Sequence, residues 1–250
     1  MKILISFPQK SNFILKNLSY VVFLSSISFI LCYSLGKCSL GIYEGIYGIG
    51  LCQVSPSLLP AGASSPPYVV AIDPGHGGKE PGAGSGTGIY ERDVTYNIAT
   101  YLKAYLESAG ATVVFSRDNS ASVPEIEERR FNTLKNNPDM FVSVHCDSSN
   151  DSSMNGSSVY YYKNYSGPLA FAISKNLPSA VKQDLNYAMF DKGAHFYPFM
   201  VTRVENCPSV LVECGFISNS QDFAIINSPA GQNSIARGIY NGIVEYCSWY

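Results

Sequence analysis

The chain has 250 residues, of which 46% are hydrophobic and 14% are charged, and its formal net charge at pH 7 is −2. This length and composition fit one folded domain with an additional segment better than two full domains. A net charge this close to zero argues against the basic surface that nucleic-acid binding requires, so no nucleic-acid partner is expected. The seven cysteines include no Cys-x-x-Cys pair, which argues against a structural zinc knuckle.

Residues 1–36 have the pattern of an export segment. Lys2, Lys10 and Lys16 precede an uncharged, apolar stretch that is about as long as a membrane span. A cleaved signal peptide and a retained membrane anchor both fit this pattern. Either would take the chain out of the cytoplasm, to the periplasm or cell envelope, and would bring its N-terminal segment into contact with the membrane. Residues 37–67 are rich in proline and are predicted to form a linker.

From residue 68 to 250, predicted strands and helices alternate. Apolar runs bounded by turn residues predict buried strands, and apolar residues spaced by three or four predict amphipathic helices. The expected strands are, in chain order, 68–73, 111–116, 139–145, 158–162, 198–203 and 209–213. The expected helices are 91–109, 124–136, 167–177, a short one near Gln221, and 233–246. Strands joined by helical crossovers predict a single α/β domain with a twisted, mostly parallel sheet flanked by helices on both faces.

Four residues that can bind a metal or carry protons occur at or near strand ends. His76 follows the first strand and its Pro-Gly turn, His145 ends the third strand, and Glu213 ends the last. Glu91 begins the helix after a glycine-rich loop. Ligands of an open α/β sheet bind outside the carboxyl ends of its strands, so these side chains are expected to gather there. Two imidazoles and a carboxylate are the ligands of a catalytic zinc, and a further carboxylate can move protons beside it.

Taken singly, each of these residues has an ordinary explanation. His76 can be a loop histidine, His145 a hydrogen-bonded core histidine, and Glu91 a first-turn glutamate that complements the helix dipole. Their joint occurrence with a terminal glutamate is what favours a metal site. The loop at 81–88 contains several glycines but satisfies neither the dinucleotide-binding pattern nor that of a P-loop, so nucleotide binding is not expected.

Several motifs occur in a fixed order between residues 69 and 246. They are IDPGHGG at 72–78, ERDV at 91–94, SRD at 116–118, ER at 128–129, DMFVSVH at 139–145 and PSVLVECGFISN at 208–219. This series resembles the zinc-dependent N-acetylmuramoyl-L-alanine amidases of bacterial cell walls, the Amidase_3 family. The resemblance implies that His76, Glu91 and His145 bind Zn²⁺ and that Glu213 is the catalytic carboxylate. It also implies an enzyme that cleaves the amide bond between N-acetylmuramic acid and L-alanine in peptidoglycan. We expect the catalytic domain to span residues 68–250 and to be monomeric.

The chain departs from the family pattern just after the second histidine, where a small residue and an asparagine are usual. Cys146 and Asp147 stand there instead. Because side chains alternate along a strand, Cys146 should point away from the metal, and Cys214 in the last strand should do the same. Asp147 should return toward the site and is a candidate for substrate binding. Arg203 is a second candidate, which could meet a peptide carboxylate or simply be a surface charge.

Two other functions remain open for the same residues. One is a zinc peptidase that cuts within the stem peptide, and the other is a non-catalytic module that binds the cell wall, which would have no use for Glu213. Some members of the family carry a helical insertion that plugs the site until an activator displaces it. Here residues 178–196 show no long amphipathic stripe. The sequence therefore predicts an open groove and a constitutively active domain, restrained by its tether.

Overall fold

The computed structural model describes residues 68–119 and 126–249 of the chain, together with two short strands closer to the N-terminus. The chain divides into two compact units, Met1–Ala61 and Gly62–Tyr250. The second unit contains all the motifs that carry the family resemblance. It therefore holds the four candidate site residues.

The first unit is described only at two strands. These are β1 (Tyr20–Leu24) and β2 (Ile27–Leu31), which pair antiparallel. The linker predicted at 37–67, and the rest of the predicted export segment, lie outside the described residues. Among the described residues, no helix combines the length and the apolar character needed to cross a membrane.

The second unit is built on a six-stranded sheet. Its strands are β3 (Val69–Pro74), β4 (Thr112–Phe115), β5 (Met140–Asp147), β6 (Ser157–Tyr161), β7 (Asp191–Phe196) and β8 (Ser209–Phe216). Their order in the sheet is β4-β3-β5-β8-β6-β7. All neighbours run parallel except β6 and β8, which pair antiparallel. The predicted α/β fold with a mostly parallel sheet is confirmed.

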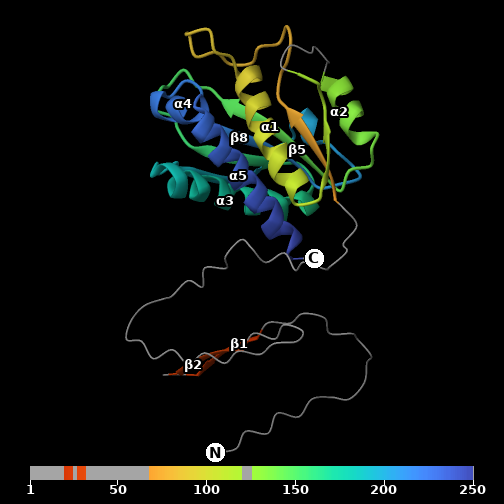
Figure 1. Ribbon diagram of the computed structural model, residues 1–250, viewed down its shortest axis with the longest axis vertical. Helices are drawn as coiled ribbons and strands as arrows, with labels where there is room; N and C mark the ends of the chain where they lie inside the picture. The colour runs from red at the N-terminus through yellow and green to blue at the C-terminus, as the bar shows by residue number, and fades with distance from the viewer. Residues whose placement is uncertain (1–19, 25–26, 32–67, 120–125, 250) are drawn as a thin grey trace, which may run out of the picture. The chain divides into compact units, whose positions relative to one another are not determined.

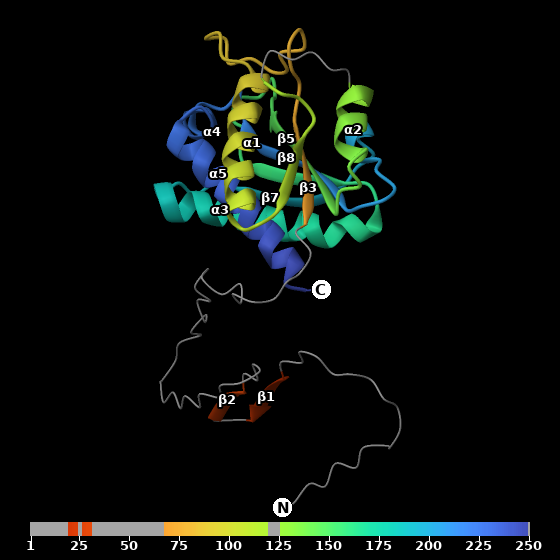
Figure 2. The same ribbon diagram turned by 45° about the vertical axis from the view of Figure 1, so that its right-hand side comes forward.

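Helices cover both faces of this sheet. They are α1 (Glu91–Ser108), α2 (Ile126–Leu134), α3 (Gly167–Leu185), α4 (Ser220–Ile226) and α5 (Pro229–Cys247), with short 3-10 helices η1 (Asn164–Ser166) and η2 (Met200–Thr202). In Figures 1 and 2, α1, α3 and α5 lie on one side of the sheet and α2 lies on the other. The apolar stripe predicted for α1 is the face that it buries, at Val94, Ile98, Leu102 and Leu106.

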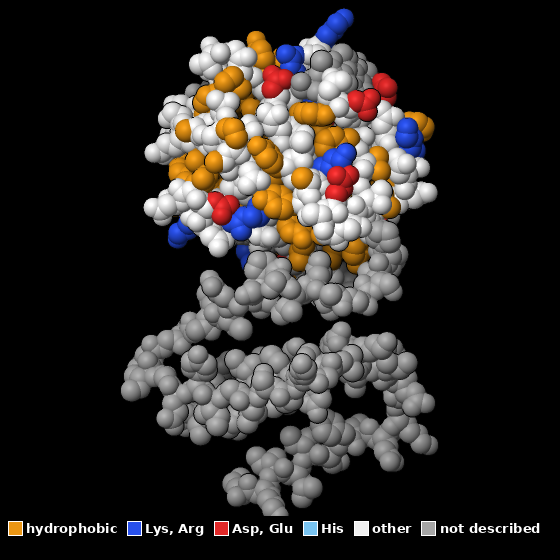
Figure 3. All heavy atoms as spheres, viewed as in Figure 1, with side chains coloured by type: hydrophobic (Ala, Val, Ile, Leu, Met, Phe, Trp, Pro, Cys, Tyr) orange, Lys and Arg blue, Asp and Glu red, His pale blue; other side chains and the backbone are white. Residues whose placement is uncertain are grey.

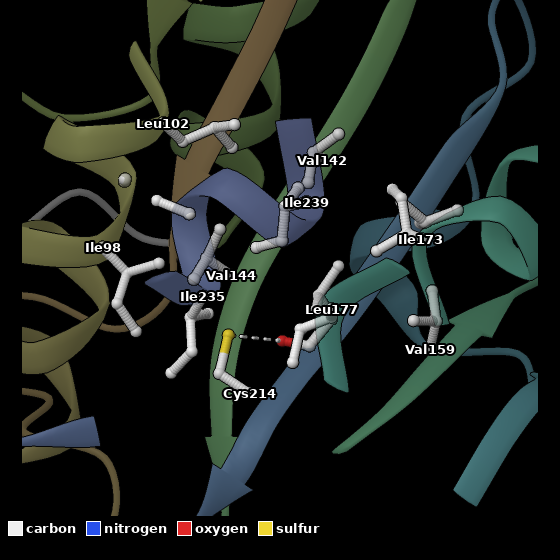
Figure 4. Packing of buried hydrophobic residues seen from close by; sticks show 14 of the residues in the cluster. Ile98, Leu102, Val142, Val144, Val159, Ile173, Leu177, Cys214, Ile235 and Ile239 are labelled. Carbon is white, nitrogen blue, oxygen red and sulfur yellow. Dashed lines mark hydrogen bonds between the residues drawn. The ribbon is translucent and has the colours of Figure 1, made fainter. Parts of the chain in front are cut away.

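The sheet separates two hydrophobic clusters. The larger one lies beneath α1, α3 and α5, and Figure 4 shows it around Val144, Leu177 and Ile235. The smaller one, on the α2 side, includes Phe141 and Leu211. Charged side chains are sparse on the outer surface shown in Figure 3, where apolar and uncharged polar side chains prevail. Successive residues of β5 and β8 alternate between the two clusters, so each strand has a defined α2 face and a defined α5 face.

Two elements differ from the sequence prediction. The helix expected to end near residue 177 continues through Pro178 to Leu185, because Leu177 and Val181 extend its buried stripe and this packing outweighs the hydrogen bond that proline removes. The strand expected at 198–203 is wrong: that segment contains η2, and the strand lies earlier, as β7. A glycine with positive φ, Gly193, interrupts β7 and obscures the alternation by which a strand is recognised.

Candidate active site

Three of the four predicted site residues form a cluster with metal-ligand geometry. One nitrogen or oxygen from each of His76, Glu91 and His145 lies within 4.8 Å of the others. The distance from His76 Nε2 to Glu91 Oε2 is 3.2 Å, and that from His145 Nδ1 to Glu91 Oε1 is 2.9 Å. Ligand atoms on one tetrahedral zinc, with bonds of about 2.0–2.1 Å, lie about 3.3 Å apart. The spacing of these side chains is therefore suited to holding such an ion.

The turn after β3 brings His76 against His145. The two rings lie 5.0 Å apart, edge to face. His76 adopts a left-handed backbone conformation with φ of 61°, which few residues other than glycine occupy without a cost. Gly75 faces the His145 ring so closely that a Cβ atom there would lie 2.3–2.6 Å from three ring atoms. The absence of a side chain at residue 75 is thus required for both histidines to occupy one site.

Glu91 is buried at the start of α1, and its carboxylate is held on both sides. Its Oε2 accepts a hydrogen bond from the backbone N–H of Ala83 at 2.9 Å, and its Oε1 accepts one from Cys146 N–H at 3.0 Å. Burial alone would raise the pKa of Glu91, but the hydrogen bonds from His145 and His76 outweigh it and lower the pKa well below its usual range. Glu91 therefore supplies a fixed negative charge to the cluster.

Glu213 lies beside this cluster on the neighbouring strand. It is the register partner of His145 on β5 and of Ser158 on β6, which places the three side chains on the α2 face of the sheet. Its Oε2 is buried, and neither this oxygen nor the buried Ser158 hydroxyl has a hydrogen-bond partner within the described residues. Buried polar atoms without partners are rare in folded proteins. Both atoms therefore have hydrogen-bonding capacity that the described residues leave unused.

The electrostatic surroundings set the protonation of Glu213. Burial raises the pKa of this carboxyl well above its usual range, and the negative charges of Glu91 and Asp147 act in the same direction. A cation held by the cluster would act in the opposite direction. Glu213 is thus placed where its affinity for a proton depends on its neighbours, as expected of a group that accepts and returns a proton.

A buried arginine joins the two segments that carry His76 and Glu91. Arg117 donates from Nε to the Pro74 carbonyl at 3.0 Å and from Nη2 to the Arg92 carbonyl at 2.7 Å. Burial lowers the pKa of Arg117 to about 10, so it remains charged at neutral pH. Arg117 belongs to the SRD motif at 116–118, but the sequence alone does not indicate this role. Its position directly after a strand that neighbours the His76 strand was the available signal.

A second buried network ties together the strands beneath the site. Asp73, at the end of β3, is wholly buried, and Arg129 of α2 approaches its Oδ1 to 3.0 Å. Ser116 donates to the same oxygen at 2.6 Å, and Ser143 donates to Oδ2 at 2.8 Å. These groups belong to β3, β5, the end of β4 and α2. The charge of Asp73 is thereby compensated, and the four segments are held in register.

Comparisons with known proteins identify the family of the chain. The family described as N-acetylmuramoyl-L-alanine amidase, Amidase_3, matches residues 70–245. The chain belongs to this family. LytC of Bacillus subtilis, an N-acetylmuramoyl-L-alanine amidase, is 34% identical over 179 residues, which are 71% of this chain and 35% of LytC. The chain thus aligns with about a third of that relative.

Solved structures of N-acetylmuramoyl-L-alanine amidases share the fold. The catalytic domain of CwlV, an N-acetylmuramoyl-L-alanine amidase from Bacillus (Paenibacillus) polymyxa var. colistinus, matches with a TM-score of 0.66 and 31% identity. That match covers 72% of this chain and 98% of CwlV's. The amidase AmiC2 of Nostoc punctiforme gives a TM-score of 0.65 and 33% identity, covering 72% of this chain and 97% of its own.

The other predicted residues of this Amidase_3 chain have different positions. Asp147 ends β5 close to the cluster, half buried; burial raises its pKa, and the charge of Lys192 acts in the opposite direction. Arg203 does not join the site. It follows η2 at the opposite end of β8, where it donates to the Pro198 carbonyl and lines a cavity of about 470 Å³ with Arg130. The structure therefore offers no support for Arg203 as a substrate-binding residue.

The two cysteines beside the site point away from it, as predicted. Cys146 and Cys214 are buried in the cluster beneath α1, α3 and α5, on the other face of the sheet from His145 and Glu213. Figure 4 shows Cys214 among Val144, Leu177 and Ile235. Burial raises the pKa of both thiols well above the usual range, so they remain protonated and are poor metal ligands.

Proposed function

We propose that the chain is a zinc-dependent N-acetylmuramoyl-L-alanine amidase that hydrolyses the bond between N-acetylmuramic acid and L-alanine in peptidoglycan. The observation that carries the proposal is the position of Glu213. Its buried, unpartnered Oε2 lies on the strand next to His145, on the same face as a His-Glu-His cluster. A metal site with an adjacent proton carrier is the arrangement that metal-assisted hydrolysis requires.

His76, Glu91 and His145 are the residues that would hold the ion. Their donor set of two nitrogens and one carboxylate oxygen matches catalytic zinc and leaves one position open. Zinc bound there would polarise the scissile carbonyl and increase the acidity of a water molecule. The residues around the cluster fix it in advance, because Glu91 is hydrogen-bonded by two backbone N–H groups and the adjoining segments are joined by Arg117.

Glu213 carries the proton in this reaction. Its Oε2 accepts a proton from the attacking water as the water approaches the lactyl carbonyl. The protonated Glu213 then returns that proton to the nitrogen of L-alanine as the amide bond breaks, and the carboxylate is restored. Ser158, whose hydroxyl is also unpartnered, is placed to hydrogen-bond the water or the substrate beside Glu213.

The part of the chain before the domain suggests where the enzyme works. We propose that residues 1–36 direct export and that 37–67 tether the domain, which then acts as a monomer in the periplasm or cell envelope. The uncharged stretch behind three lysines supports this proposal. Its membrane contact is checked by fractionating cells that produce the full chain and locating it in membrane and soluble fractions.

The proposed reaction is tested by mass spectrometry of peptidoglycan digested with zinc-loaded protein. An amidase releases stem peptides with a free L-alanine amine and leaves the lactyl group on the glycan. A peptidase within the stem releases shorter peptides and leaves L-alanine attached to the glycan. A wall-binding module sediments with the polymer and releases nothing. The last two results would each overturn the proposed activity.

A further inference from the structure

A cluster of aromatic rings begins beside Glu213 on the next strand of the sheet. Tyr160 lies two residues after Ser158, the register partner of Glu213, and pairs with Leu211. Side chains two residues apart share a face, so Tyr160 lies on the face of Glu213. Diagonal neighbours on antiparallel strands are about 7–8 Å apart. The Tyr160 ring is therefore a diagonal neighbour of Glu213 on the same face of the sheet.

Three further rings pack around Tyr160, and the four together are named the aromatic wall: Tyr160, His195, Tyr197 and Phe199. The centre of the Tyr160 ring lies 5.6 Å from that of His195, 6.2 Å from that of Tyr197 and 5.2 Å from that of Phe199. The His195 ring is held by its Nε2, 2.8 Å from the Lys192 carbonyl. The rings of Tyr197 and Phe199 lie 4.5 Å apart. The wall is thus a fixed surface and not a set of independent side chains.

The aromatic wall is open to solvent on its outer side. Tyr197 is 51% exposed and His195 is also exposed, while Tyr160 and Phe199 are half-buried against the smaller hydrophobic cluster. Exposed aromatic surface next to a reactive group is a common feature of binding sites. If the four rings served only to pack against the rest of the domain, His195 and Tyr197 would not need to be exposed.

Nearby lysine and arginine side chains are directed toward other rings. The Lys192 ammonium lies over the ring of Phe216, and the Arg203 guanidinium lies over that of Tyr162. A ligand rich in carboxylates, such as a stem peptide, is recognised by cations paired with those carboxylates. The aromatic wall suits a neutral ligand with apolar faces instead. The C–H face of a pyranose ring has this character.

We propose that the aromatic wall is the subsite for the N-acetylmuramoyl sugar and the adjoining glycan. This inference rests on the proposed amidase function. The lactyl group joins the scissile amide directly to the sugar ring, so a ring stacked on Tyr160 keeps the amide within reach of Glu213. The buried Ser158 hydroxyl, between the two, supplies a hydrogen-bonding group for the polar atoms at the junction. The glycan then continues over His195 and Tyr197.

The direct test uses chitopentaose, a neutral β-1,4-linked oligomer of N-acetylglucosamine without peptide. Binding to the zinc-loaded full chain is measured by calorimetric titration for the parent and for the double variant His195→Ala/Tyr197→Ala. Loss of two stacking rings should weaken binding about fivefold or more. Phe171→Ala is the matched control, because this aromatic residue is 58% exposed but lies on α3, on the other face. Unchanged affinity in the double variant, or no binding by the parent, overturns the proposal.

A kinetic test separates glycan from peptide recognition. The double variant should lose kcat/KM about fivefold on a muramoyl dipeptide and keep the parent value on the matching lactoyl dipeptide, which lacks the sugar. Equal losses on both substrates would assign the rings to the peptide and overturn the inference. A parent chain that binds chitopentaose through these rings but hydrolyses neither substrate would contradict the amidase function while supporting the aromatic wall.

Discussion

His145 and Glu213 are register partners on the parallel strands β5 and β8, so their side chains leave one face of the sheet side by side. Neighbouring strands are about 4.8 Å apart, which places the proposed proton carrier Glu213 next to the proposed metal ligand His145. Glu213→Gln should therefore retain fold and zinc but lower kcat about 10²–10⁴-fold, because the amide cannot accept the proton. Peptide release from purified peptidoglycan measures this loss, alongside the zinc content. Turnover within tenfold of the parent would remove Glu213 from the mechanism.

The metal assignment predicts that two of the three histidines are needed for zinc. His76→Ala and His145→Ala should each lose bound zinc on dialysis, because each removes one of three protein ligands. His195→Ala is the matched control and should retain it, since His195 lies on β7 outside the cluster. Metal analysis of the dialysed proteins gives the result. Stoichiometric zinc without His76 or His145 would refute the assignment of that ligand.

Because Gly75 lies so close to His145, the single added methyl group of Gly75→Ala is predicted to weaken zinc binding. A Cβ at residue 75 would lie 2.3–2.6 Å from the His145 ring, so Gly75→Ala must displace that ring. Zinc affinity should fall about 10–100-fold, the usual cost of disturbing the support of a metal ligand. Gly86→Ala is the comparison, because no atom lies within 4 Å of its added methyl group although its φ is +77°. Gly86→Ala should cost about 1 kcal/mol of stability and leave zinc affinity unchanged. Equal zinc affinities in both variants would contradict the prediction.

The sequence predicted the parts of the fold that depend on local patterns. The buried strands β3, β5 and β8 are apolar runs in the sequence, and α1 has the spacing of an amphipathic helix. In each of these elements, the fold buries most of the residues that are apolar in the sequence. The candidate ligands could be predicted because His76 and His145 lie near the ends of β3 and β5 and Glu91 begins α1. The extension of α3 through Pro178 could not be predicted, because it depends on tertiary packing that opposes the local preference of proline.

The contacts that hold the site residues in place could not be predicted from the sequence. The clamp by Arg117 joins carbonyl groups that are about 25 and 43 residues away in the chain, and no local pattern reports such a contact. The unpartnered hydroxyl of Ser158 also depends on the register of β6 against β8. The sequence predicts a strand at 198–203, which would bring Arg203 toward the site. The observed η2 leaves Arg203 at the far end of β8.

Arg117 is predicted to be a positioning residue for the metal site. Arg117→Met should weaken zinc binding about tenfold, because the segments that carry His76 and Glu91 are no longer joined. Arg117→Lys should recover only part of this loss, since an ammonium cannot reproduce the planar array of donors. The measurements are the zinc Kd and the thermal midpoint of the metal-free protein.

A second buried arginine provides the control for this prediction. Arg129→Met removes the ion-pair partner of the wholly buried Asp73 and should lower the free energy of unfolding by about 3–5 kcal/mol. Arg129 contacts neither carbonyl beside the ligands, so zinc affinity should change much less than in Arg117→Met. If the zinc Kd of both variants follows their loss of stability in proportion, Arg117 has only a structural role.

The region between His145 and Glu213 predicts an enzyme that needs no activator. Residues 146–212 are all described, and α3 is their only α-helix. It packs through Leu177 and Val181 into the cluster on the face opposite Glu213, so it cannot plug the site. Residues 65–250 produced alone and loaded with zinc should therefore hydrolyse purified peptidoglycan without any added protein, while the same fragment carrying Glu213→Gln should not. A folded, zinc-loaded fragment that remains silent until a cell-envelope extract is added would contradict this prediction and point to regulation by a partner.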